Sequence, residues 1–258
     1  MTTRREAILK EMGLTPLWKS RGVTPGRPGT GGPDESSVPP VPPGDFVEDD
    51  RPAAMTPSIA REARIAKMDW PALKAAVPAC TACVLHKSRT QTVFGVGDEM
   101  ADWLLVGEAP GAEEDQQGEP FVGQAGRLLD MMLTSIRLSR ATNVYIANVL
   151  KCRPPGNRNP EANEVAQCSP HLLRQLGLIQ PKLIVAMGRF AAQTLLATDA
   201  SIASLRGRVH SYRGVPLIVT YHPAYLLRTP ADKSKSWQDL LFAVRTMEGL
   251  QAGGAAPT

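Results

Sequence analysis

Four short, predominantly apolar runs constrain the fold of this 258-residue chain more than any other feature of its sequence. None of them shows the apolar–polar alternation of a strand with one face in water, and they occupy residues 103–106, 144–149, 183–186 and 216–219. Such runs are typical of parallel strands that helices cover on both faces. Segments with helical periodicity alternate with them, at 127–136, 161–176, 189–196 and 234–250. We therefore expect a three-layer α/β/α sandwich around a four-stranded parallel sheet, with 208–213 as a candidate edge strand.

The composition of residues 21–57 differs from that of the rest of the chain. Nine of these 37 residues are Pro and six are Gly, with few large apolar side chains between them, which predicts a disordered linker. Residues 1–20 carry apolar side chains at helical spacing, so we expect a short helix that is either a solvated terminus or a docking peptide for a protein partner. The main domain is expected at 58–250, followed by a flexible tail at 251–258.

The charge of the chain is also uneven. Residues 58–258 carry a net charge of +5, whereas residues 1–57 carry −1. A basic domain suits an anionic partner such as nucleic acid, although this signal is weak alone. No apolar run approaches the roughly 20 residues that span a bilayer, and charged residues stand where a signal peptide would be apolar. We therefore expect a cytoplasmic protein with no membrane partner.

Ligands of an open parallel sheet bind beyond the carboxyl ends of its strands, so the segments after the apolar runs are the places to search for a site. Segment 107–123 combines glycines and prolines with several carboxylates, among them Glu108 and Glu114. Phe121 offers a flat stacking surface in the same segment. The segment is either part of a pocket or a solvated acidic loop with a buried Phe. It lacks the Gly-Lys-Ser/Thr ending of a phosphate loop.

Two other segments carry side chains suited to base recognition. Asn148 lies in the second run, and its amide offers both a donor and an acceptor for the edge of a base. The next ten residues add three cationic side chains. His222 follows the last run and could donate a hydrogen bond to developing negative charge, although a lone His is more often structural. Leu226 and Leu227, followed by Arg228, would be exposed on a loop unless they pack inside or enter a base stack.

The four cysteines have the spacing of a metal or cluster site. Cys80 and Cys83 form a CxxC pair after a helix with Asp69 as its N-cap, and Cys152 and Cys168 follow singly. In a reducing compartment such cysteines are better ligands than disulfide partners. Four thiolates can bind an iron–sulfur cluster or zinc, and the 15 residues between the last two are unlike a zinc finger.

Taken together, these features resemble the family 4 uracil-DNA glycosylases over about residues 68–247. The resemblance rests on GEAPG at 107–111, PFVG at 120–123, Asn148, the four cysteines and HPAYLLR at 222–228. It implies an α/β/α fold, a 4Fe-4S cluster on the four cysteines, and hydrolysis of the N-glycosidic bond of deoxyuridine in single- or double-stranded DNA. The products would be uracil and an abasic site, as in base excision repair.

The resemblance also implies roles for individual residues. Phe121 would stack on the flipped uracil, Asn148 would read its pyrimidine edge, and His222 would hydrogen-bond a uracil carbonyl. Better-known uracil-DNA glycosylase families place an Asp or Asn near Ala109 to orient the attacking water, so here that water needs another partner.

Three pocket residues are candidates for this task. We expect Glu114 to orient the water or shape the pocket, and Glu108 to position the substrate. Asn157 would support them.

On the DNA side, Leu226 and Leu227 would fill the space that the flipped nucleotide leaves, and Arg228 would contact phosphate. A rival hypothesis is a non-catalytic iron–sulfur protein that binds nucleic acid with the same fold, and a second rival replaces the cluster by zinc. We expect a nucleoid-associated monomer that shows ordinary turnover.

Overall fold

The computed structural model describes residues 57–253. The helix expected at 1–20 and the linker expected at 21–57, apart from Pro57, lie outside the described residues, as do residues 254–258. The described chain begins with helix α2 (Pro57–Ile65), one residue before the predicted start of the main domain. No helix within this range is long and apolar enough to cross a membrane.

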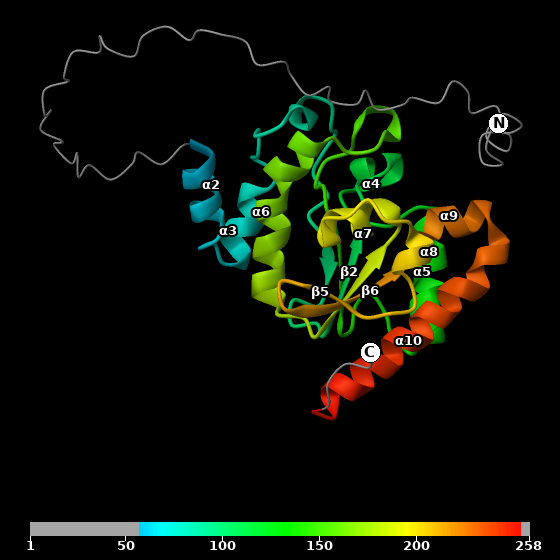
Figure 1. Ribbon diagram of the computed structural model, residues 1–258. Helices are drawn as coiled ribbons and strands as arrows, with labels where there is room; N and C mark the ends of the chain where they lie inside the picture. Colours follow the sequence, from blue (N-terminus) through cyan, green and yellow to red (C-terminus); the bar gives the residue numbers. More distant parts are fainter. Residues whose placement is uncertain (1–56, 254–258) are drawn as a thin grey trace, which may run out of the picture. The chain divides into compact units, whose positions relative to one another are not determined.

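A six-stranded sheet in the order β1-β3-β2-β4-β6-β5 forms the centre of the domain (Figure 1). Its four middle strands are parallel, as the apolar runs predict, and comprise β2 (Trp103–Gly107), β3 (Val144–Asn148), β4 (Leu183–Met187) and β6 (Val215–Thr220). Two antiparallel edge strands extend this four-stranded parallel centre. Antiparallel β5 (His210–Tyr212) confirms the candidate edge strand, whereas β1 (Val96–Gly97), antiparallel to β3, was not predicted.

Helices cover both faces of this sheet, which confirms the three-layer sandwich. One hydrophobic core cluster joins the sheet to α6 (Ala162–Ile179) and α7 (Arg189–Leu196). The other joins it to α5 (Gln124–Ser135) and α10 (Lys233–Gln251). Successive residues of the middle strands alternate between the two clusters, because side chains of a strand point to opposite faces. The long apolar runs are thus explained by burial on both sides.

The remaining elements are short and lie around this core. Helix α3 (Trp70–Ala76) begins as predicted, because the Asp69 carboxylate accepts a hydrogen bond from the Ala72 amide at 3.0 Å. Helices α2 and α3 pack against α6. The other short helices are η1 (Val84–Lys87), α4 (Ala112–Gln117), η2 (Pro155–Asn157), α8 (Ile202–Leu205), α9 (Pro223–Arg228) and η3 (Pro230–Asp232).

Helix α4 corrects the alternative of a solvated acidic loop after β2. Its first turn carries the consecutive carboxylates 113–115, where the N-terminus of a helix favours negative charge. Asp115 is buried, and both of its carboxylate oxygens accept from the Thr90 amide at 3.0 Å. This carboxylate therefore anchors the segment that follows the CxxC pair.

Candidate active site

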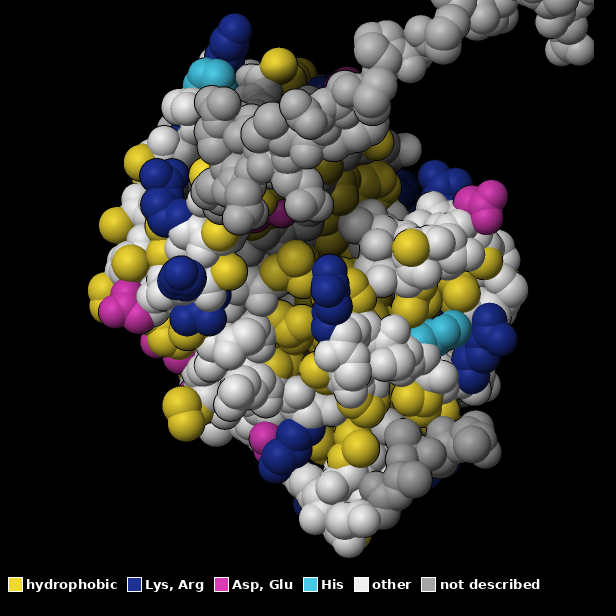
Figure 2. All heavy atoms as spheres, turned by 60° about the vertical axis from the view of Figure 1, so that its left-hand side comes forward, with side chains coloured by type: hydrophobic (Ala, Val, Ile, Leu, Met, Phe, Trp, Pro, Cys, Tyr) yellow, Lys and Arg dark blue, Asp and Glu magenta, His cyan; other side chains and the backbone are white. Residues whose placement is uncertain are grey.

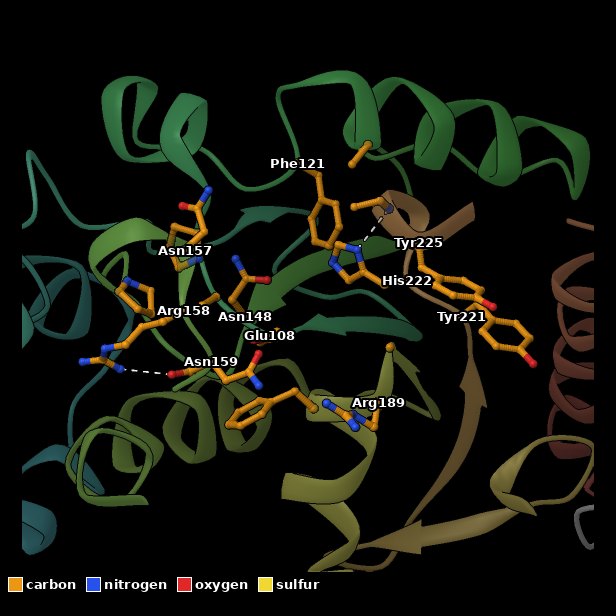
Figure 3. Close-up of a pocket in the computed structure, with 18 of the residues that line it drawn as sticks. Glu108, Phe121, Asn148, Asn157, Arg158, Asn159, Arg189, Tyr221, His222 and Tyr225 are labelled. Atoms are coloured by element: carbon orange, nitrogen blue, oxygen red, sulfur yellow. Dashed lines mark hydrogen bonds between the residues drawn. The ribbon is translucent and has the colours of Figure 1, made fainter. Parts of the chain in front are cut away.

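A cavity of about 720 Å³ opens at the carboxyl edge of the parallel strands. Segments that follow β2, β3, β4 and β6 all line it, so residues far apart in the sequence meet there (Figure 3). Eight predicted site residues line this cavity: Glu108, Ala109, Glu114, Phe121, Asn148, Asn157, His222 and Arg228. Its position agrees with the rule that ligands of such sheets bind beyond the strand ends.

An aromatic pair forms one wall of the cavity. The rings of Phe121 and His222 stack with their centroids 5.3 Å apart and their planes at 29°. Phe121 has a φ of +55°, in the left-handed region that costs a residue other than glycine about 1–2 kcal/mol. A Cβ on Gly107 would lie 2.8 Å from the Phe121 ring and 2.4 Å from the Asn148 amide oxygen. Glycine at 107 therefore leaves room for both side chains.

Asn148 is the last residue of β3, and its side-chain amide is buried at the base of the cavity (Figure 3). Its Oδ1 has no hydrogen-bond partner among the described residues. An unpaired buried acceptor costs about 1–3 kcal/mol, so the fold retains here a group that a ligand donor would satisfy.

His222 is held in one tautomer by the helix that it caps. Its Nδ1 accepts from the Ala224 amide at 3.1 Å at the start of α9, so the ring hydrogen resides on Nε2. Burial, and then the charge of Arg228, lower the pKa of His222 to about 4. At neutral pH the ring is therefore an uncharged donor through Nε2.

The two predicted pocket carboxylates differ in their hydrogen bonding. Glu114 accepts from the amides of Gly111 at 3.1 Å, Val122 at 3.1 Å and Gly123 at 3.5 Å, so it ties α4 to the Phe121 loop. The Glu108 carboxylate makes no hydrogen bond to another described residue. Burial raises the pKa of Glu108, and the nearby charge of Arg189 partly opposes that rise. Glu108 is thus the carboxylate with free oxygens at the cavity.

Leu226 and Leu227, which we expected to act together, differ in exposure. Both residues lie on α9 rather than on a loop. Leu226 is only 1% exposed, because this side of the helix packs into the domain, so its side chain is not at the surface where a DNA wedge would be. Leu227 is 39% exposed. Asn157 does reach the cavity, but its Oδ1 already accepts from the Arg153 Nε at 2.7 Å.

Sequence reasoning missed several cavity residues. Arg189 is the first residue of α7, two positions after the end of β4, in a segment that strand order marked for search, but no motif distinguished it. Tyr221 directly precedes the predicted histidine motif and Tyr225 lies inside it without an assigned role, and their rings stack with centroids 5.1 Å apart. The Arg206 guanidinium lies 5.0 Å from the Tyr221 ring centroid. An aromatic repeat at i and i+4 was the available signal for the tyrosine pair.

The four cysteines line a second, smaller cavity, between the CxxC segment, the end of β3 and α6. Two sulfurs have cationic neighbours: Arg89 Nη1 is 3.2 Å from the Cys152 Sγ, and Arg61 Nη2 is 3.5 Å from the Cys80 Sγ. The Lys151 amide donates to the Cys168 Sγ at 3.2 Å. Across residues 57–253, no three His, Cys, Asp or Glu side chains form a site for a single metal ion.

Fold and site together define a class of protein: an α/β/α domain whose pocket, at the carboxyl edge of its sheet, is lined by stacked aromatic rings and a buried amide. Residues 94–241 match the family described as the uracil DNA glycosylase superfamily. The chain belongs to this superfamily, and its similarity is to the type-4 members.

Three relatives illustrate that similarity. The type-4 uracil-DNA glycosylase of Archaeoglobus fulgidus is 48% identical over 162 residues, which cover 60% of this chain and 81% of that protein. The Pyrobaculum aerophilum enzyme of the same name is 41% identical over 181 residues, or 67% of this chain and 92% of that protein. The Thermotoga maritima enzyme is 44% identical over 159 residues, or 61% and 82%.

Proposed function

We propose that this protein is a uracil-DNA glycosylase of base excision repair, which hydrolyses the bond between uracil and deoxyribose in DNA. The observation that carries this function is the meeting of a flat ring, an unsatisfied amide and a neutral imidazole donor in one cavity. Membership of the superfamily supports the reaction, and the type-4 relatives support the choice of uracil.

Each of the three side chains has a contact that suits uracil. The Phe121 ring stacks on the face of the flipped base. The unpaired Oδ1 of Asn148 accepts from the N3 hydrogen, and its Nδ2 donates to O4. The Nε2 of His222 donates to O2. Cytosine would present an acceptor to Oδ1 and a donor to Nδ2, so the same amide orientation rejects it.

The chemistry requires stabilisation of two opposite charges. When the glycosidic bond breaks, uracil leaves as an anion with charge on O2, while the sugar develops cationic character. A neutral His222 held by its Nδ1 contact is a preorganised donor to O2, and loss of one such donor typically costs about 10²–10³ in kcat. Because the His222 ring is already uncharged at neutral pH, it can donate from Nε2 without first losing a second ring proton.

We assign the attacking water to Glu108 rather than to Glu114. Three backbone amides already use the Glu114 carboxylate, so it serves the other expected role, shaping the pocket. Glu108 lies in the cavity with free oxygens, and Arg189 favours its charged form. As a carboxylate it can orient water and face the cationic sugar. Ala109 leaves space beside it.

The surface around the cavity suits a DNA strand. Arg228 lines the cavity mouth and would contact phosphate, and the exposed Leu227 on the same helix would occupy the space left by the flipped nucleotide. Figure 2 shows one face of the molecule, on which Lys and Arg side chains are spread among apolar and acidic side chains. Asn157 supports the rim through Arg153.

We propose that Cys80, Cys83, Cys152 and Cys168, which all line the second cavity, would hold a 4Fe-4S cluster. Such a cluster with four thiolates carries net negative charge, and cationic groups meet it. Lys151 gives the strongest support, because its side chain is 1% exposed and, among the described residues, its Nζ donates only to the Asn148 carbonyl, at 2.9 Å. A buried ammonium needs a nearby negative charge. The bound cluster supplies folding energy that joins these segments.

Strand cleavage at uracil tests the proposal. A labelled oligonucleotide with one uracil is incubated with wild type, Asn148→Ala or His222→Ala and then treated with alkali, which breaks abasic sites. We expect cleavage by wild type and a loss of cleavage rate of at least about 100-fold in each variant. The control Lys182→Gln, at the amino end of β4 and away from the cavity, should lose no activity. A folded, brown wild type that binds the oligonucleotide and leaves uracil intact would establish the non-catalytic rival.

The remaining expectations about the whole chain are also proposals. We propose a catalytic unit at 58–250, a cytoplasmic and nucleoid-associated monomer, and a protein partner for residues 1–20. Size-exclusion chromatography with light scattering on the full chain tests the monomer, and a pull-down with wild type and a chain lacking residues 1–20 tests the partner.

A further inference from the structure

Arg140 lies outside the cavity but contacts the backbone that carries its aromatic wall. It belongs to the turn between α5 and β3, and its side chain is 22% exposed. Its Nη1 donates to the Pro120 carbonyl at 2.9 Å and its Nη2 to the Phe121 carbonyl at 2.8 Å. Its Nε donates to Asp130 on α5 at 2.9 Å. One guanidinium therefore holds two consecutive carbonyl groups.

These two carbonyls define the conformation of Phe121. They belong to the peptide groups on either side of its Cα, so fixing both fixes the rotation about that atom. An extended residue points successive carbonyls in opposite directions, whereas the left-handed conformation of Phe121 turns them to one side. A planar guanidinium can bind both carbonyls when they point to one side, so it disfavours an extended Phe121. Arg140 thus helps to hold Phe121 in the left-handed conformation observed here.

Two other contacts hold the same loop from different sides. Glu114 accepts from the Val122 amide, which belongs to the peptide group after Phe121. A Cβ on Gly126 would lie 1.7 Å from the Phe121 carbonyl oxygen, so the first turn of α5 packs directly against that group. The Phe121 carbonyl therefore has little room to move, and it accepts its hydrogen bond from Arg140.

We propose that Arg140 is a positioning residue for pyrimidine binding, because it holds Phe121 in the left-handed conformation that aims its ring at the cavity. The proposal rests on the proposed function, since it requires Phe121 to stack on uracil. Arg140 does not line the cavity and touches no substrate atom. A guanidinium is needed, because a lysine ammonium is a point donor that lacks the planar fork.

Kinetics of Arg140 variants separate this role from a general structural one. We compare Arg140→Ala and Arg140→Lys with Asp130→Asn, which removes the partner acid and leaves both carbonyl contacts. Arg140→Ala should lower kcat/KM on a uracil oligonucleotide by about 100-fold and weaken inhibition by free uracil about 10-fold, because the stacking ring is misplaced. Arg140→Lys should show a partial loss, and Asp130→Asn less than about 3-fold. Melting temperatures are measured in parallel.

Chemical rescue of the glycosylase activity gives a second test of the positioning role. Guanidinium chloride at tens of millimolar should restore part of the activity of Arg140→Ala, whereas sodium chloride at equal ionic strength should not. His222→Ala should not respond. Normal uracil inhibition in a folded Arg140→Ala protein, or equal recovery with sodium chloride, would overturn the positioning role. An inactive wild type would instead show that the proposed function itself has failed.

Discussion

The charge of His222 is a property of the site that pH can test. Its pKa of about 4 lies well below the usual 6.5, first because of burial and second because of Arg228. A shift of this size disfavours the proton by about 3 kcal/mol. At pH 6.5, where an ordinary histidine is half protonated, His222 would be about 0.3% protonated. We therefore expect kcat to show no inflection from His222 between about pH 5.5 and about pH 8.

The assay combines single-turnover kinetics on a uracil oligonucleotide with titration of the His222 ring by NMR. Protonation of His222 should lower the kcat of wild type only as the pH approaches about 4, whereas protonation of Glu108, whose pKa burial raises, lowers kcat at a higher pH. Arg228→Gln should move the ring titration upward, because it removes the second cause. A ring titration near 6.5 in the folded enzyme, with a matching inflection in kcat, would refute the neutral donor.

The same shift predicts how stability depends on pH. Because the folded pKa is lower than the unfolded one, the unfolded chain binds the extra proton between pH 4 and 6.5. The contribution of His222 to the free energy of unfolding is therefore complete above about pH 6.5 and is lost as the pH falls toward about 4. Denaturant unfolding of wild type and His222→Gln should show a shallower pH dependence for the variant.

Three substitutions test other parts of the molecule. Gly126→Ala should displace the Phe121 loop, since its Cβ would lie 1.7 Å from the Phe121 carbonyl oxygen, and we expect about 10-fold weaker inhibition by free uracil; unchanged inhibition would contradict this packing. Lys151→Met removes the buried cation beside the cysteines, and iron and sulfide content per chain should fall; full content would argue against the counter-charge. Leu227→Ala should weaken binding of uracil-containing duplex about 5-fold without changing inhibition by free uracil; a change in both would place Leu227 in the pocket.

The parallel centre of the sheet could be predicted because burial on both faces leaves an unambiguous pattern of apolar runs. The edge strands of the sheet were harder to predict. Strand β1 has two residues, and Gly97 has a φ of +131°, so neither length nor propensity identifies it. Helix α4 has glycines at both ends, and such punctuation in a sequence indicates a loop as readily as a six-residue helix.

The site was predictable where a residue type alone determines the chemistry, as for the Asn148 amide and the His222 imidazole. The site could not be predicted where hydrogen bonding decides the role of a residue. Glu108 and Glu114 are chemically identical, and only the backbone amides that surround Glu114 separate them. Leu226 and Leu227 are adjacent in sequence, and the side of α9 on which each lies decides which is exposed. Arg140 acts on main-chain carbonyls, which leave no sequence signal.

The short distance along the chain between Asn148 and Cys152 has a physiological consequence. The amide that we propose reads the base and a thiol that we propose holds the cluster lie four residues apart, and Lys151 between them donates to the Asn148 carbonyl. Loss of iron would therefore disturb uracil recognition directly, without unfolding of the distant β6 side of the pocket. In a cell, the capacity to remove uracil from the genome would then follow iron supply and oxidative stress, even at constant enzyme abundance.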